Sequence, residues 1–204
     1  MSGALVTAIL ALGLAVIVVR RRSIAIALVA LQSLALGLGA LGLAGGRSEL
    51  LVAGLVLLTK AVVLPTLLLV VMRRTREARL VAPAAGPLLR LAGAGAVALL
   101  AVLMVPPLGL SDPQTEGTAV ALVLMGITIV VARRPAFFQL LGLIVAENGL
   151  SLLAISVPGG LAYVVELGAL LDLALVVTVA AAFTQRIHGE LGTGDTELLR
   201  GLRD

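Results

Sequence analysis

Long apolar runs dominate the chain and are separated by short breaks that are polar or rich in glycine and proline. A helix needs about 20 apolar residues to cross a hydrocarbon core of about 30 Å. The Leu, Val and Ala runs lack the alternation of barrel strands, and a helix satisfies its own backbone hydrogen bonds in lipid. The sequence therefore predicts an all-α membrane helix bundle with about seven transmembrane helices, at residues 3–19, 23–43, 50–72, 88–108, 117–132, 136–157 and 161–185.

Glycine and proline mark the breaks between these segments. The breaks are Gly45-Gly46, Pro83 to Pro87, Pro106-Pro107 through Pro113, and Pro158-Gly159-Gly160. We expect residues 1–185 to form a single transmembrane domain and residues 186–204 a short cytoplasmic tail. The first run lacks the basic leading segment and cleavage site of a signal peptide, which predicts a retained helix. Two further glycines, Gly93 and Gly95, are expected to permit close helix packing inside the fourth segment.

Charge patterning indicates how the chain lies in the membrane. Only 13% of its residues are charged, against about a quarter in soluble domains. A net charge of +4 would suggest nucleic acid in a soluble protein, but here the arginines cluster between apolar runs, so we expect a lipid bilayer and no nucleic acid as partner. Thirteen of the fifteen basic residues lie in alternate loops or the tail, which predicts an amino terminus outside and a cytoplasmic carboxyl terminus.

Several kinds of chemistry are excluded by residue content. The chain has no cysteine and a single histidine, His188, so it offers neither an iron–sulfur site nor a bis-histidine haem site. No phosphate-binding loop, dinucleotide turn, nucleophile elbow or spaced histidine pair is present. We therefore expect no cofactor, no metal site and no catalytic residue in this chain, which would not itself be an enzyme.

An internal repeat is suggested by a shift of 112 residues. This shift lays residues 17–22 over residues 129–134, matching Ile-Val-Val and Arg-Arg, and it lays Lys60 over Asp172. Both units would contain three helices with an intramembrane charge in the third. Because both first helices would run in the same direction, the hypothesis is a parallel duplication with the fourth helix as the odd element.

Three ionisable residues fall near the centre of predicted helices: Lys60, Glu147 and Asp172. One charged side chain at the centre of a membrane helix costs about 2.5–3.5 kcal/mol on insertion scales, so all three should face protein or water. Loss of water brings buried carboxyls and amines closer to neutrality, which makes proton exchange feasible. We interpret them as parts of a proton path. The alternative is that Lys60 pairs with a carboxylate only to hold helices together, and the sequence does not identify its partner.

Three further polar residues are candidates for smaller roles. Glu166 lies about five residues inside the predicted outer boundary, where it is either a proton uptake or release group or an interfacial residue that reaches headgroup water. Gln32 is interpreted as a hydrogen-bonding residue between helices, with a channel role as the alternative. Asn148 follows Glu147 directly and could hold a water beside it.

The carboxyl-terminal third resembles hydrogenase-4 component E, a membrane subunit of energy-converting hydrogenase and formate hydrogenlyase complexes. The resemblance is carried by ENG at residues 147–149, by VE-x-G-x-x-x-D at residues 165–172 and by RIH at residues 186–188. The segment TKAVVLPTLLLVVMRR of the third predicted helix is also similar to that family, as is the length of seven helices.

Through that family, the last three helices are similar to the K subunit of respiratory complex I and the C subunit of multisubunit cation/proton antiporters. RRPAFFQLLGLIVAEN resembles the K-subunit pattern of paired basic residues, an LIGLE-type stretch and a downstream Asn. The acid here lies three residues later than in that pattern, which keeps Glu147 on the same helix face as the family's first carboxylate. The second carboxylate would be matched by Asp172 or Glu166.

The resemblance implies a noncatalytic subunit that contributes ionisable residues to proton or cation translocation in a bacterial plasma (inner) membrane. Its implied partners are antiporter-like membrane subunits, a complex I-like membrane anchor, and peripheral nickel-iron hydrogenase and iron–sulfur subunits. Two alternatives stay open. One is an autonomous secondary transporter built on the parallel repeat, and the other is a structural membrane subunit whose charges fix helix packing.

Overall fold

The structure is a computed structural model of the whole chain. It describes residues 1–74, 112–133, 136–157, 161, 163–168, 170, 171 and 174, together with 86, 91–93, 95–97, 99 and 103. The predicted helices at 88–108 and 161–185 therefore lie partly outside the described residues, and Asp172, His188 and the tail at 186–204 lie wholly outside them. Where residues 91–103 and 163–174 are described, they are helical.

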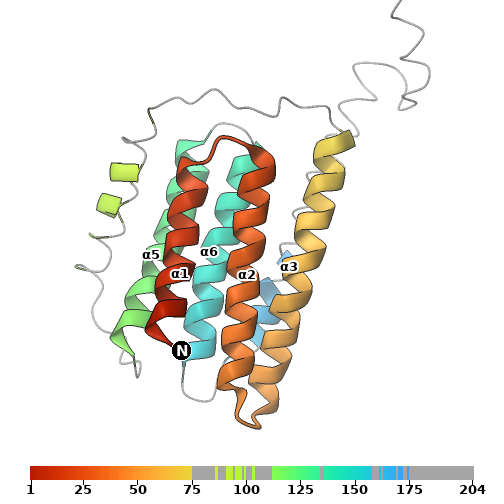
Figure 1. Cartoon of the computed structure of the whole chain (residues 1–204), viewed down its shortest axis with the longest axis vertical. Coiled ribbons are helices and arrows are strands. Elements are labelled where there is room, and N and C mark those ends of the chain that lie inside the picture. The colour runs from red at the N-terminus through yellow and green to blue at the C-terminus, as the bar shows by residue number, and fades with distance from the viewer. Residues whose placement is uncertain are drawn as a thin grey trace, which may run out of the picture.

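The described part of the chain is an all-α membrane helix bundle without a strand (Figure 1). Its helices are α1 (Gly3–Val18), α2 (Arg22–Ala44), α3 (Ser48–Arg74), α5 (Pro113–Ala132) and α6 (Ala136–Ser156). Four of them, α2, α3, α5 and α6, are long and apolar enough to cross a membrane. The 16-residue α1 is apolar but shorter than these spans.

Helix ends agree with the predicted segments to within two residues, except at the start of α5. Pro113 belongs to a predicted break between helices, but the helix begins at this residue. The reason is that a proline suits the first helical position, where its missing N–H costs no hydrogen bond. Asp112 precedes it as the N-cap residue, and its side chain accepts a hydrogen bond from the backbone N–H of Gln114 at 3.1 Å. The prediction that α5 starts at residue 117 was therefore wrong by one turn.

The helices form two hairpins that lie side by side. α2 packs along α3 and α5 along α6, while α1 contacts both α2 and α5, and α2 also contacts α6. In Figure 1, α1, α3 and α5 run in one direction and α2 and α6 in the other, so α1 is parallel to α5 and α2 to α6. The shift of 112 residues carries α2 onto residues 134–156, and α6 spans Ala136–Ser156. These directions and bounds agree with those that a parallel repeat requires of the first two helices in each unit.

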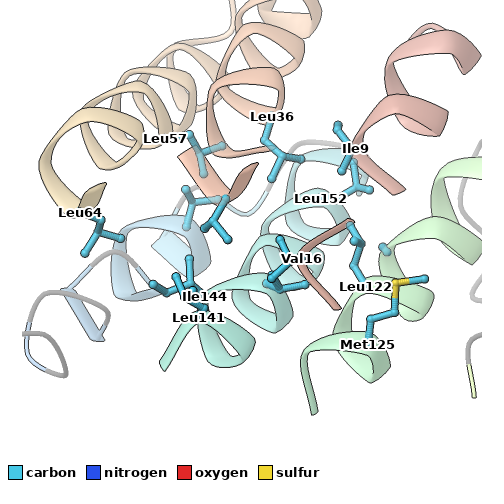
Figure 2. Packing of buried hydrophobic residues seen from close by; sticks show 14 of the residues in the cluster. Ile9, Val16, Leu36, Leu57, Leu64, Leu122, Met125, Leu141, Ile144 and Leu152 are labelled. Carbon is cyan, nitrogen blue, oxygen red and sulfur yellow. The ribbon is translucent and has the colours of Figure 1, made fainter. Parts of the chain in front are cut away.

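One hydrophobic core joins all five helices (Figure 2). Ile9 of α1, Leu36 of α2, Leu57 of α3, Leu122 of α5 and Leu141 of α6 are each fully buried. Of the four long spans α6 is the most enclosed, with 78% of an apolar stretch of 18 residues buried, whereas the corresponding share for α3 is 33%. Large apolar side chains remain exposed along α2 and α3, as expected of surfaces that face lipid.

Glycines set the closest helix contacts. A Cβ at Gly142 of α6 would lie 2.8 Å from the carbonyl oxygen of Gly126 of α5. A Cβ at Gly149 would lie 2.7 Å from the carbonyl oxygen of Ala119. These distances are shorter than real Cβ contacts, so the α5–α6 pair depends on small residues. In contrast, a Cβ at Gly93 or Gly95 would meet nothing within 4 Å, so the packing role predicted for these two glycines was wrong for the described residues.

Candidate functional site

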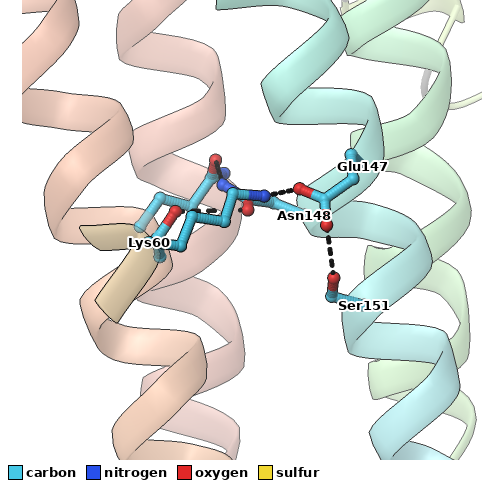
Figure 3. Close-up of polar contacts among 6 residues, drawn as sticks. Lys60, Glu147, Asn148 and Ser151 are labelled. Carbon is cyan, nitrogen blue, oxygen red and sulfur yellow. Dashed lines mark hydrogen bonds and ion pairs between the residues drawn. The ribbon is translucent and has the colours of Figure 1, made fainter. Parts of the chain in front are cut away.

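An ion pair joins α3 to α6 near the middle of both helices. The ammonium group of Lys60 contacts Oε2 of Glu147, and the two residues are only 4% and 6% exposed (Figure 3). The acid that faces Lys60, which the sequence left undetermined, is therefore Glu147. The expectation that both side chains are sheltered from lipid is confirmed for this pair.

The second oxygen of the Glu147 carboxylate also has a partner. The Ser151 hydroxyl donates to Oε1 at 3.1 Å, from one helical turn further along α6. Ser151 is itself 1% exposed. The carboxylate is thus held from two sides, by an ammonium group on α3 and by a hydroxyl on its own helix.

Asn148, the residue after Glu147 on α6, belongs to a second network, of neutral hydrogen bonds between helices. Asn148 donates from Nδ2 to Oε1 of Gln32 at 2.9 Å, and the Ser33 hydroxyl donates to Oδ1 of Asn148 at 3.2 Å. Gln32 in turn donates from Nε2 to the carbonyl oxygen of Ile9 on α1 at 3.0 Å. The role of Gln32 as a hydrogen-bonding residue between helices is therefore confirmed. Asn148 serves the same network, and its side chain points in a different direction from that of Glu147, as expected of adjacent helical residues.

A small cavity lies beside Lys60, among residues of α2, α3 and α6. Its volume is about 10 Å³, and its lining includes Ser33 of α2, Lys60 and Pro65 of α3, and Ile144 of α6. This is close to the smallest volume that holds one water molecule. Pro65 lacks a backbone N–H and so leaves a carbonyl group of the preceding turn of α3 without its usual helical donor. Because Lys60 and Ser33 both line this cavity, the ion pair and the amide network are neighbours in space as well as in sequence.

A larger groove of about 500 Å³ also has Lys60 in its lining. Its lining is mostly apolar and comes from α3 and from the helical residues after α6, among them Leu55, Val63, Glu166 and Leu170. Glu166 is exposed at this groove, whereas Lys60 is buried beneath it. The structure thus places Glu166 along the same groove as Lys60.

Two arginines at one end of the bundle contact other helices, besides indicating orientation in the membrane. Arg133 donates from Nη2 to the carbonyl oxygens of Ile17 and Val19 at 2.7 and 3.0 Å, and its guanidinium lies 4.4 Å from the ring centroid of Phe138. It thereby donates to carbonyl groups at the C-terminal end of α1, where helical donors run out. Arg22 lies 5.3 Å from the Phe137 ring and is 6% exposed. Their apolar and hydrogen-bonding contacts were not foreseen from charge clustering alone.

The opposite end carries the N-terminal cap of α5. The Thr115 hydroxyl donates to the Asp112 carboxylate, and with the backbone N–H groups of Gln114 and Thr115 it holds the pKa of Asp112 below its ordinary value. The Gln114 side chain donates to the Thr7 hydroxyl of α1 at 3.2 Å. These contacts fix the start of α5 against α1, far along the bundle from the arginines.

Among the predicted site residues, the structure joins Lys60 to Glu147 and Gln32 to Asn148, and Asp172 lies outside the described residues. Sequence reasoning missed Ser33 and Ser151. A serine four residues after an intramembrane glutamate was the available signal for Ser151. Within the described ranges, no group of three or more His, Cys, Asp or Glu residues could hold a metal ion.

The fold and site together define a membrane helix bundle with an ion pair at its centre. The chain is 32% identical over 166 residues to "Uncharacterized protein Rv0085" of Mycobacterium tuberculosis, covering 78% of this chain and 74% of that protein. The chain belongs to the same family as this mycobacterial protein. No family model matches the chain. No solved structure matches it either.

Proposed function

We propose that the chain is a noncatalytic membrane subunit of an ion-translocating complex of the hydrogenase-4 and formate hydrogenlyase type. In this role the pair of Lys60 and Glu147 takes part in proton transfer within the membrane. Glu166 and Asp172 are proposed as further groups of the same path. The single observation that carries the proposal is the buried ion pair between α3 and α6.

The pair suits proton transfer for a chemical reason. An amine and a carboxyl in contact can exchange one proton and become a neutral pair, which removes the cost of keeping two charges away from water. Ser151 can hold the carboxyl in either form, since a hydroxyl both donates and accepts hydrogen bonds. The groove beside Lys60 offers a side from which water could approach, and Glu166 lies along it.

Orientation in the membrane is part of the proposal. Arg20 and Arg21 after α1 and Arg133 after α5 lie at the same end of the bundle as the end of α3, whereas Arg47 lies at the other end, between α2 and α3 (Figure 1). By the positive-inside rule the arginine-rich end faces the cytoplasm and the amino terminus faces outward. The proposed location is a bacterial plasma membrane, with antiporter-like subunits, a complex I-like anchor and peripheral nickel-iron and iron–sulfur subunits as partners.

An autonomous secondary transporter is the second candidate, favoured by the parallel directions of α1 with α5 and α2 with α6. The purified chain reconstituted alone in liposomes distinguishes the two. A subunit of a larger complex gives no proton or cation flux by itself, whereas a transporter does. Flux from the isolated chain that is abolished by Glu147→Gln would replace the first proposal with the second.

Complex membership is tested in native membranes. The tagged chain is purified in a mild detergent, and hydrogenase activity with a soluble electron donor or acceptor is measured in the eluate. We expect the activity to copurify with the chain and with its Glu147→Gln variant, because the carboxamide nearly matches the carboxylate in shape and, unlike an apolar side chain, keeps an oxygen that accepts hydrogen bonds. An eluate without hydrogenase activity, from membranes that contain it, contradicts the proposal.

A further inference from the structure

The helical segment of residues 163–168 lies against the carboxyl end of Glu147. A Cβ built on Gly168 would stand 2.8 Å from both Cγ and Cδ of Glu147, and still nearer to Oε1. Real Cβ atoms do not approach other atoms so closely. The observed position of the Glu147 side chain therefore requires that residue 168 has no side chain.

That position is also the one in which the carboxylate has its two partners. Oε2 contacts the Lys60 ammonium group, and Oε1 accepts the hydrogen bond from Ser151. A methyl group on residue 168 would displace Oε1, which accepts the Ser151 hydrogen bond, and Cδ, which carries Oε2 as well. We infer that Gly168 is a positioning residue for Glu147, and that it keeps the carboxylate between Lys60 and Ser151.

This inference deepens the proposed function, since it concerns the residue that the proton path uses, but its test does not depend on transport. A general packing role for Gly168 is a distinct alternative. A packing glycine meets backbone or fixed side chains, as Gly149 does at Ala119, whereas the three nearest atoms at Gly168 all belong to Glu147. A clash with one flexible side chain moves that side chain first.

The test uses the full chain in its native membranes with a hydrophobic carbodiimide as the probe, because this reagent modifies protonated carboxyl groups inside membranes. The modified residues are located by mass spectrometry after digestion. In Gly168→Ala we expect Glu147 to be modified about tenfold faster at neutral pH, the factor that corresponds to about 1.4 kcal/mol of lost stabilisation of the paired form. Glu166, two residues from the substitution and exposed, serves as the internal reference and keeps its rate.

A matched control is Gly93→Ala, another glycine-to-alanine change in a helix, at a site where a Cβ meets nothing within 4 Å. It leaves the modification rate of Glu147 unchanged. Equal rates in Gly168→Ala and the native chain, with the protein folded, overturn the inference. Faster modification of both Glu147 and Glu166 also overturns it, since that pattern means general loosening of the segment.

A second pair of variants decides the matter if Gly168→Ala does not fold. In a Glu147→Ala background the clashing atoms Cγ, Cδ and Oε1 are gone. Adding Gly168→Ala there should leave the unfolding temperature unchanged or raise it, because alanine favours helix over glycine. A further fall in unfolding temperature in that background contradicts the inference. Retained transport in Glu147→Gln would contradict the proposed function and leave these results standing.

Discussion

Lys60 of α3 and Glu147 of α6 form an ion pair across the middle of the bundle, with both side chains almost fully enclosed. Removing one partner of a buried pair leaves a charge without compensation and typically costs about 3–5 kcal/mol, whereas replacing both by apolar residues is often neutral or stabilising. The pair therefore links the two hairpins through chemistry that apolar packing alone does not provide.

The first prediction concerns this coupling. Lys60→Met and Glu147→Leu should each lower the free energy of unfolding by about 3–5 kcal/mol, because each leaves a buried group without its partner. The double variant should return close to the native value. Thermal unfolding in detergent of the two single variants and the double variant measures the effect. Additive losses in the double variant would mean that the two residues do not act as a pair.

The second prediction concerns the amide network. Asn148→Leu removes the partner of both Gln32 and Ser33, and a buried polar group without a hydrogen bond costs about 1–3 kcal/mol. We expect a loss of stability of that order with the Lys60 pair intact. Leu150→Val, on an exposed position of the same helix, serves as the control and should have little effect. Stability equal to that of the native chain in Asn148→Leu would show that the network contributes nothing.

The third prediction concerns the glycines between α5 and α6. Gly142→Ala places a methyl group against the carbonyl oxygen of Gly126, and overpacking of a tight contact costs about 1–3 kcal/mol. Gly42→Ala in α2 meets open space and should be neutral or stabilising. Comparing the unfolding temperatures of these two variants isolates the contact from helix propensity. Equal temperatures would contradict the close α5–α6 approach.

Much of the fold could be predicted because lipid leaves few options. Apolar runs of span length must be helices, and glycine and proline mark their ends, so the bounds of α2, α3 and α6 were found to within two residues. Pro113 was misassigned because proline both breaks and begins helices, and only the preceding Asp112 distinguishes the two cases. Packing glycines could not be chosen from the sequence, since a small residue is useful only where another helix approaches it.

The candidate site was predictable only as a set of unusual residues. A charge inside an apolar run indicates burial among protein groups, which identified Lys60 and Glu147. Their pairing depends on how α3 crosses α6, and no spacing along one helix encodes that relation. Ser33 was missed because it is small and common in membrane helices, whereas its value as a donor to Asn148 appears only in the folded bundle.

The fourth prediction concerns pH and the cap of α5. The pKa of Asp112 is lowered in the folded state, chiefly by the Thr115 hydroxyl, so its stabilising contribution is present above the ordinary aspartate range and is lost as pH falls through the lowered pKa. The unfolding temperature of Asp112→Ala should therefore lie below that of the native chain at neutral pH and approach it in acid. Asp112→Asn keeps a capping oxygen, so its unfolding temperature should lie above that of Asp112→Ala at all pH values. A difference between Asp112→Ala and the native chain that does not change with pH would refute this linkage.

In the proposed function, Glu147 carries protons in an assembled complex. The number of protons translocated per turnover of hydrogen chemistry, measured in membrane vesicles that hold the complex with Glu147→Gln, tests this role. We predict normal assembly, which copurification measures, together with loss of most proton translocation, because a carboxamide cannot exchange the proton. An unchanged ratio of protons to turnover in the assembled variant would contradict the account.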